Sequence, residues 1–268
     1  MIFLYLIAAL IALYIFSTSC RRGHTGLQNL RGWAYAHRGF HGEGAPENSM
    51  EAFRRAKDAG YGIELDVHLL SDGSLAVMHD SALKRTTGAE GEMEDLTSSV
   101  LKDYRLEGTE ETIPLFSDVL DLIDGTVPLI VELKCARNNY RELCAATCAL
   151  LDSYRGVYCL ESFDPRCIYW LRKNRPELIR GQLTENYFAS SSSKLPWYLK
   201  LILTHQMLNF LVYPDFVAYK FRDRRNLSNL LARKLWGATG VTWTLQTSRE
   251  LEAADREGWI PIFENFKA

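Results

Sequence analysis

Eight short β-rich runs, each followed by a helical pattern, limit the fold of this chain more than any other feature. The runs cover residues 34–37, 62–67, 128–133, 157–162, 179–183, 216–219, 240–244 and 259–263. Strands that alternate with helices form parallel sheets with crossover helices, and eight such units in about 230 residues are enough to close a barrel. The sequence therefore predicts an α/β fold, a (β/α)8 TIM barrel, over residues 33–268.

An additional strand is expected after the second run, where Asp72-Gly73 lies between two β-like segments. This dipeptide is a strong signal for a two-residue hairpin turn. With Ser71 opposite Ser74, the inserted β-hairpin would place Asp66 opposite His79 and return His79 to the mouth of the barrel. A helix is expected over residues 49–59, with Asn48 as its N-cap.

The N-terminus carries an unbroken apolar run over residues 2–16, which approaches the ~20 residues of a membrane-spanning helix. No positive charge precedes it, which argues against a cleaved signal peptide, and Ser17 does not fit a lipid-attachment motif ending at Cys20. We therefore expect one transmembrane anchor over residues 1–20 and a linker over residues 21–32. Since Arg21, Arg22 and Arg31 follow the run, the positive-inside rule places the C-terminal domain in the cytoplasm.

The formal net charge of −2 argues against one class of partner. Basic and acidic residues are spread evenly, whereas nucleic-acid binding depends on basic patches. No nucleic-acid partner is therefore expected, and the oligomeric state is left open.

Three acidic residues in strand-like runs suggest a metal site. Glu64 and Asp66 are two residues apart on one predicted strand, so they point to the same face, and Glu132 ends the apolar run PLIVE. Because the carboxyl ends of barrel strands meet at one face, the three carboxylates could bind one hard cation, Mg or Ca. The alternative is a set of salt bridges to Arg38 or Lys134.

Two histidines are candidates for acid–base chemistry beside this cation. His37 closes the first strand, His79 closes the hairpin, and imidazole titrates near neutral pH. Arg38 and Lys134 would supply positive charge for an anionic substrate, because an arginine fork matches phosphate oxygens. A rim salt bridge is an equally good interpretation of Lys134.

Several motifs occur together and in order: AHRGFHGEGAPENSMEAF, GIELDVHLLSDGSLAVMHD, VELK, SFDP and VTWTL. In these the chain resembles the glycerophosphodiester phosphodiesterase family from about residue 33 to residue 266. The resemblance implies that Glu64, Asp66 and Glu132 bind the metal and that His37 and His79 are the acid–base pair. It further implies that Arg38 and Lys134 contact phosphate, that Glu47 supports the site and that Trp243 lines the pocket, although Trp243 could equally be a core aromatic.

The resemblance implies metal-dependent hydrolysis of a glycerophosphodiester to sn-glycerol 3-phosphate and an alcohol. Two alternatives stay open: a lysophospholipase D or phospholipase C-like activity on membrane lipids, and a non-catalytic binder of phospholipid or polyol phosphate. The apolar stretch 194–212 is expected to be a barrel helix, or else a face that rests on the bilayer and admits lysophospholipids. The last strand ends in Glu264 where the family often has Asp, and no role is predicted for Glu264.

Overall fold

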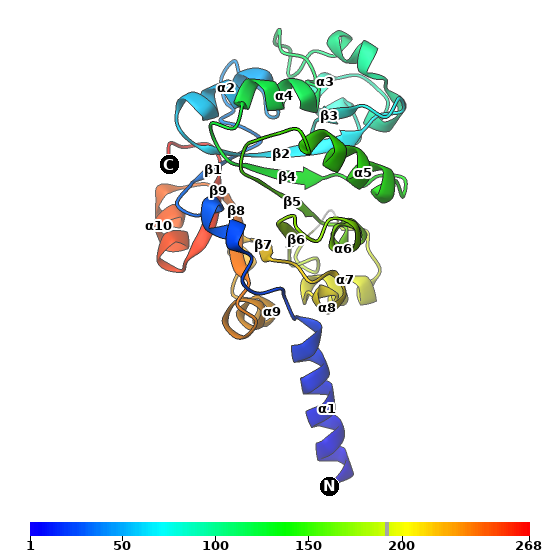
Figure 1. The fold of residues 1–268 in the computed structure, drawn as a ribbon, viewed down its shortest axis with the longest axis vertical. Helices are drawn as coiled ribbons and strands as arrows, with labels where there is room; N and C mark the ends of the chain where they lie inside the picture. Colours follow the sequence, from blue (N-terminus) through cyan, green and yellow to red (C-terminus); the bar gives the residue numbers. More distant parts are fainter. Residues whose placement is uncertain (191–192) are drawn as a thin grey trace.

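Eight parallel strands close into a barrel in the computed structural model, which describes residues 1–190 and 193–268 (Figure 1). The hydrogen-bonded order is β1-β2-β4-β5-β6-β7-β8-β9, and β9 pairs with β1 to complete the ring. One further strand, β3, lies outside this ring and pairs antiparallel with the end of β2. All eight predicted barrel strands are present, so the predicted TIM barrel is confirmed.

The strands are β1 (Tyr35–His37), β2 (Gly62–Leu69), β3 (Leu75–Val77), β4 (Leu129–Leu133), β5 (Tyr158–Ser162), β6 (Arg180–Thr184), β7 (Phe216–Lys220), β8 (Thr239–Leu245) and β9 (Trp259–Phe263). The helices are α1 (Ile2–Ser17), α2 (Met50–Asp58), α3 (Lys84–Thr87), α4 (Phe116–Ile123), α5 (Tyr140–Leu151), α6 (Pro165–Asn174), α7 (Trp197–Thr204), α8 (Asn209–Val212), α9 (Leu227–Leu230) and α10 (Ser248–Arg256). Shorter helical turns are η1 (Thr25–Leu30), η2 (Met93–Asp95), η3 (Ser98–Asp103), η4 (Phe221–Asp223) and η5 (Leu231–Leu235).

Alternation along the strands separates an outer core from the barrel interior. On β2, Ile63, Leu65 and Val67 join the cluster that packs under the helices. Successive strand side chains point to opposite faces, so Glu64 and Asp66 between them point inward. The same alternation on β4 turns Glu132 inward, and this arrangement brings the acidic residues into one interior.

The hairpin between β2 and β3 differs from the prediction by one residue. Val67 pairs with Val77 and Leu69 with Leu75, so the predicted register was wrong. The N–H of Leu70 donates a hydrogen bond to Ser74 O (2.9 Å), so the turn between these two residues holds three residues. Gly73 takes a positive φ of 84°, as is common in three-residue hairpin loops.

The N-cap of α2 also differs by one residue. Ser49, rather than Asn48, accepts a hydrogen bond from Ala52 N at 3.2 Å through its hydroxyl. A hydroxyl acceptor at this position satisfies one of the unpaired N–H groups of the first helical turn. Asn48 is thereby left for another contact, described below.

The expected membrane-spanning helix is not found. The apolar helix α1 covers 16 residues, about 24 Å at about 1.5 Å per residue, whereas a bilayer core is about 30 Å thick. Among residues 1–190 and 193–268, no helix is both long enough and apolar enough to cross a membrane.

The segment after α1 packs against the barrel. Cys20 is buried beside Val217 and Ala232, and Arg21 forms an ion pair with Asp215. Farther along, Leu30 is buried and its carbonyl accepts a hydrogen bond from Tyr35 Oη (2.9 Å). Residues 21–32, expected as a linker, thus lie close against the barrel.

Candidate active site

The three predicted metal ligands meet inside the barrel. Glu64 and Asp66 lie on β2, Glu132 lies on β4 directly opposite Asp66, and all three are buried. Each offers a carboxylate oxygen, and these oxygens lie within 4.8 Å of one another. The convergence expected from the strand ends is therefore present.

The charges of these carboxylates oppose one another. Burial, followed by the repulsion of Asp66 and Glu132, raises the pKa of Glu64 well above its usual range. Burial also raises the pKa of Glu132 to about 7. Burial acts in the same direction on Asp66, but the charge of Lys134 keeps the pKa of that carboxyl below its usual range. Buried carboxylate oxygens crowded in this way fit a hard divalent cation.

Lys134 compensates part of this negative charge. Its Nζ lies 2.8 Å from Glu132 Oε1 and 2.9 Å from Asp66 Oδ1. Lys134 therefore forms the salt bridges that were the alternative to phosphate binding. One ammonium group cannot balance three carboxylates, and Glu64 lacks this contact. The salt bridges and a cation site are therefore compatible here.

His37 is held by a carboxylate that was given no role. Its Nδ1 lies 2.5 Å from Glu264 Oε2, and its Nε2 lies 4.0 Å from Glu64 Oε2. Burial lowers the pKa of His37, and the hydrogen bond with Glu264 partly opposes that shift. Nε2, on the side of the predicted metal ligands, is the ring nitrogen that Glu264 does not hold. His41 Nε2 lies 3.7 Å from the same oxygen of Glu264.

His79 is held in the same way. Its Nδ1 lies 2.6 Å from Asp80 Oδ1, and Asp80 in turn pairs with Arg85. The preceding residue, Met78, donates its N–H to Asp66 O at 3.1 Å, which places His79 beside the predicted metal ligands despite the shifted register. Burial lowers the pKa of His79 to about 4.

Arg38 enters the site through an unusual backbone. Its φ is 55°, its N–H donates to Glu64 Oε2 (3.1 Å), and its Nη1 donates to Glu47 Oε1 (2.9 Å). Its Nε lies 3.5 Å from Asp66 Oδ2. Gly39 follows with φ 81°, where a Cβ atom would lie 2.9 Å from the backbone of Ala52. The His-Arg-Gly order thus lets the chain turn sharply beside the three buried carboxylates.

Glu47 and Asn48 support this turn. Glu47 also accepts two hydrogen bonds from Arg85, at 2.9 and 2.6 Å, and so links Arg38 to Arg85. The amide of Asn48, freed from helix capping, donates to Asp66 Oδ2 at 2.8 Å. Glu47 thus positions the side chain of Arg38, and Asn48 positions the carboxylate of Asp66.

Trp243 lies on β8 at the barrel mouth, half-buried. Its ring meets the edge of Phe163, with centroids 5.6 Å apart, and Lys220 Nζ lies 5.4 Å from its ring centroid. Its Nε1 is buried and has no hydrogen-bond partner within the described part of the chain. An indole N–H in this state is available to a bound molecule.

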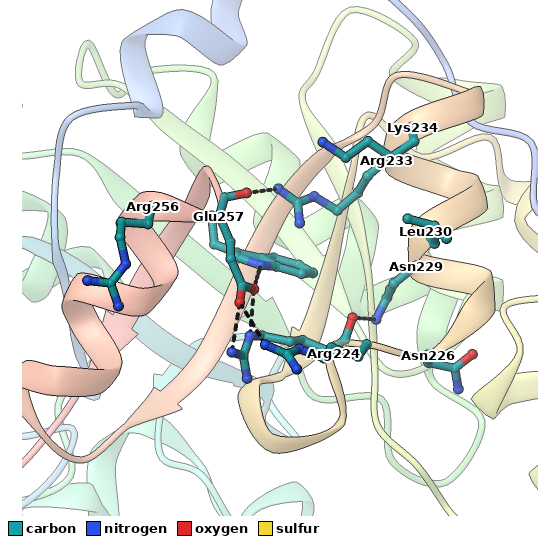
Figure 2. Close-up of a pocket in the computed structure, with 10 residues that line it drawn as sticks. Arg224, Asn226, Asn229, Leu230, Arg233, Lys234, Arg256 and Glu257 are labelled. Atoms are coloured by element: carbon teal, nitrogen blue, oxygen red, sulfur yellow. Dashed lines mark hydrogen bonds and ion pairs between the residues drawn. The ribbon is translucent and has the colours of Figure 1, made fainter.

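A separate groove lies on the outside of the barrel. It has a volume of about 420 Å³ and lies between α9, η5 and the end of α10 (Figure 2). Glu257 there accepts hydrogen bonds from Arg224 at 2.7 and 2.9 Å. None of the carboxylates or histidines described above lines this groove, so it is distinct from the candidate active site.

Three carboxylates near the predicted ligands and histidines were given no role from the sequence. Glu264 directly follows β9 and Asp80 directly follows His79, so both stood at positions that drew attention, but no partner was assigned to either. Glu161 lies within β5, opposite Glu132, and is 1% exposed. Burial raises its pKa well above the usual range. An acidic residue inside the apolar run YCLES carried the same signal as Glu132 did.

Comparison with known proteins gives a consistent result. Residues 37–265 match the glycerophosphoryl diester phosphodiesterase family. A glycerophosphodiester phosphodiesterase of Caldanaerobacter subterraneus is 31% identical over 195 residues, covering 68% of this chain and 78% of that protein. Glycerophosphodiester phosphodiesterase 1 of Homo sapiens is 27% identical, covering 81% and 72%. A third relative, from Bacillus altitudinis, is 41% identical over 114 residues, which span 40% of this chain and 46% of that protein.

Two solved structures share the fold. A phosphodiesterase of Oleispira antarctica, solved with the product sn-glycerol-3-phosphate, superposes with a TM-score of 0.71 at 22% identity, covering 87% of this chain and 92% of that one. A glycerophosphodiester phosphodiesterase of Thermotoga maritima gives a TM-score of 0.66 at 22% identity, with coverages of 87% and 95%. The family match over residues 37–265 goes further than the fold, and the chain belongs to the glycerophosphoryl diester phosphodiesterase family of enzymes.

Proposed function

We propose that this enzyme hydrolyses glycerophosphodiesters to sn-glycerol 3-phosphate and an alcohol with the help of Mg or Ca. One observation carries the proposal. Three buried carboxylates, with oxygens within 4.8 Å of one another, lie beside two histidines that are each held at Nδ1 by a carboxylate. The Oleispira relative, solved with sn-glycerol-3-phosphate, supports the choice of product.

Glu64, Asp66 and Glu132 would hold the cation. When bound, a divalent ion supplies Lewis acidity at a phosphoryl oxygen and makes a nearby hydroxyl more acidic. Arg38 and Lys134 would bind the phosphate oxygens, since both carry positive charge beside the carboxylates. Trp243 would offer its unpaired indole N–H and ring to the substrate at the mouth.

The histidines would move the protons. One takes a proton from the attacking hydroxyl at its Nε2, and the other protonates the leaving alcohol. The attacking group is either the glycerol hydroxyl next to the ester oxygen, which gains from proximity, or water. Phosphorus NMR during turnover separates these routes, because only the first passes through a cyclic glycerol phosphate.

The deciding experiment is a substrate panel with chelator and metal add-back. Turnover of glycerophosphocholine to sn-glycerol 3-phosphate and choline, lost with chelator and restored by Mg or Ca, is the expected result. Release of diacylglycerol from intact phospholipid would favour a phospholipase C-like activity instead. Binding of these compounds without turnover at any metal concentration would leave a non-catalytic binder and overturn the proposal.

We also propose that α1 holds the enzyme at a lipid bilayer. The helix carries no charged residue and its side chains up to Leu13 are exposed, which is costly in water. The test is flotation of the full chain with liposomes against a chain lacking residues 2–13. The deletion stops there because Tyr14 Oη contacts His205 Nδ1 (3.2 Å) and Phe16 packs on Phe210.

Flotation of the full chain and not of the shortened one is expected. A full chain that stays out of the lipid fraction would contradict this location. The cytoplasmic side of the bilayer remains a prediction from Arg21, Arg22 and Arg31.

A further inference from the structure

The groove between α9, η5 and the end of α10 is lined mainly by basic side chains (Figure 2). Its one carboxylate among the described residues is Glu257, and its five cationic residues are Arg224, Arg225, Arg233, Lys234 and Arg256. The whole chain has a formal net charge of −2, so this excess of positive charge is local. A concave surface lined by one sign of charge attracts a ligand of the opposite sign. We call this space the basic groove.

The acidic residues near the basic groove neutralise only part of its charge. Glu257 accepts hydrogen bonds from Arg224 at 2.7 and 2.9 Å and lies 3.6 Å from Arg225. Arg256 lies 3.9 Å from Glu252 on the same helix, and both side chains are exposed, so this pair contributes little. Lys234 forms no ion pair within residues 1–190 and 193–268. The basic groove therefore keeps a positive charge that a bound anion could balance.

Arg233 is held in the wall of the basic groove without a carboxylate. Its Nη2 donates to the carbonyl oxygens of Glu257 and Gly258, at 2.8 and 2.9 Å, and its guanidinium carbon lies 3.7 Å from the ring centroid of Trp259. Burial lowers the pKa of Arg233, as expected for a cation whose charge is incompletely compensated. A guanidinium group fixed in this way offers a planar fork of N–H donors, which matches the oxygens of a phosphate group.

The η5 wall of the basic groove is attached to the end of α1. Trp236 directly follows η5, and its Nε1 donates to Ile15 O of α1 at 3.0 Å. Arg22, which comes after α1, donates through Nε to Trp236 O at 2.9 Å. Figure 1 shows α9 beside the end of α1 that meets the barrel. If α1 enters a bilayer, the basic groove lies near the lipid head groups.

Exposed leucines accompany the cations on this segment. Leu227, Leu230 and Leu235 are 54%, 54% and 46% exposed, and Leu230 lines the basic groove. Apolar side chains among cations are typical of segments that lie at a lipid–water interface, because the apolar groups enter the boundary of the acyl region while the cations meet the anionic head groups. A free phosphate ion would gain nothing from these leucines, so they favour a lipid as the source of the phosphate.

We propose that the basic groove binds a phosphate group, which an anionic lipid of the bilayer presents to it. No bond is made or broken there, and the site is separate from the carboxylates and histidines of the candidate active site. Only the source of the phosphate rests on the proposed location of α1, because the charges of the groove are the same wherever α1 lies. A bound lipid would hold the barrel against the bilayer on the side of α9 and α10.

The test measures partitioning of the full chain onto liposomes by flotation across a range of lipid concentrations. Liposomes of phosphatidylcholine are compared with liposomes that also contain phosphatidic acid. Each Lys or Arg near an anionic surface strengthens partitioning by about fivefold, so Lys234→Gln with Arg256→Gln should weaken binding to phosphatidic acid liposomes by about 25-fold. Binding of this double variant to phosphatidylcholine alone should stay within about twofold of the parent, and its melting temperature checks that it is folded.

Two controls separate a phosphate site from general surface charge. Arg222→Gln with Arg249→Gln removes the same charge from residues just before α9 and on α10 that do not line the basic groove, and should bind like the parent. Liposomes with oleic acid, matched for surface potential, are anionic but carry no added phosphate, and the parent should bind them more weakly. Equal weakening of both double variants, or equal binding of the parent to both anionic liposomes, would overturn the site.

The two proposals can fail separately. A full chain that binds only liposomes with phosphatidic acid, and does so through Lys234 and Arg256, would support the basic groove and contradict the location of α1. Equilibrium dialysis of the chelator-treated full chain with inorganic phosphate, in non-ionic detergent, tests the other source. Saturable binding that the Lys234→Gln, Arg256→Gln variant loses, without any gain from phosphatidic acid, would support a phosphate site and overturn its lipid source. Absence of both effects would overturn the inference.

Discussion

Replacing Glu264 by glutamine tests the assembly of the site most directly. The side chain keeps its size, and the carboxylate held 2.5 Å from His37 Nδ1 becomes a neutral amide. A carboxylate in this place stabilises the imidazolium that forms when the histidine takes a proton, and fixes the ring. Glu264 is therefore a positioning residue for His37, and its loss should lower kcat more than it changes KM.

The magnitude follows from the contact. A hydrogen bond to a charged group contributes about 1.5–3 kcal/mol, which corresponds to about a 10- to 150-fold fall in kcat. The pH profile should move as well. Burial lowers the pKa of His37 and Glu264 partly restores it, so without the carboxylate the pKa falls further. The limb of the profile that belongs to His37 should shift to lower pH.

The assay is kcat and KM for glycerophosphocholine across pH, with melting temperature as the check on folding. Glu257→Gln is the matched control, because Glu257 accepts two hydrogen bonds from Arg224 on the outer wall of the barrel (Figure 2). It should leave both kcat and the pH limb unchanged. A folded Glu264→Gln enzyme with kcat within twofold of the parent and an unmoved limb would refute the role of Glu264.

Three other predictions concern the second histidine, the cation and the hairpin. His79→Ala should lower kcat by ~10² to 10⁴ if the ring transfers a proton, with His205→Ala as a control that keeps full turnover; parental rates in His79→Ala would exclude the role. Saturating Mg or Ca should stabilise the parent, by about 2.7 kcal/mol at a hundredfold excess over Kd, and calorimetry should show a much smaller gain for Glu132→Gln; equal gains would place the ion elsewhere. Hydrogen bonds from Ser98 and then Ser74 hold the pKa of Asp72 at about 2, so its stabilisation is present above pH ~4 and is lost as pH falls toward 2. Asp72→Asn should cost about 1 kcal/mol at neutral pH after solvent screening, and a cost that persists in denaturant titrations at pH ~2 would contradict this origin.

Strand periodicity was sufficient to predict the barrel. Glu64 alternates with apolar residues along its run, and Glu132 comes at the end of an apolar run, so both carboxylates were expected to point into the barrel. Their convergence follows because the carboxyl ends of parallel barrel strands lie at one face. The hairpin register was not predictable to one residue, because the choice between a two- and a three-residue turn depends on contacts from Ser98, which lies far along the chain. The cap of α2 shifted for a similar reason, since the amide of Asn48 bonds to the distant Asp66.

Partners that join distant strand ends were harder to find than the strands. Glu264 and His37 are 227 residues apart, and no local sequence pattern around either residue indicates that their side chains are in contact. The cavity at the carboxyl ends of β5 and β6 has the same character, because residues after β5 and on α7 form one wall only after folding. The length of the apolar helix was overestimated. Thr18, Ser19 and Cys20 were counted as part of the membrane anchor, but they follow the end of α1 and are buried against the barrel.

The contact between β1 and β9 means that the candidate site needs both ends of the barrel domain. His37 stands at the end of the first strand, and its carboxylate partner comes just after the last strand, which must dock beside the first to close the ring. A nascent polypeptide still short of residue 264 would carry the three predicted metal ligands and both histidines, but His37 would lack its carboxylate partner. Under the proposed mechanism, turnover would reach its full rate only when synthesis and ring closure are complete.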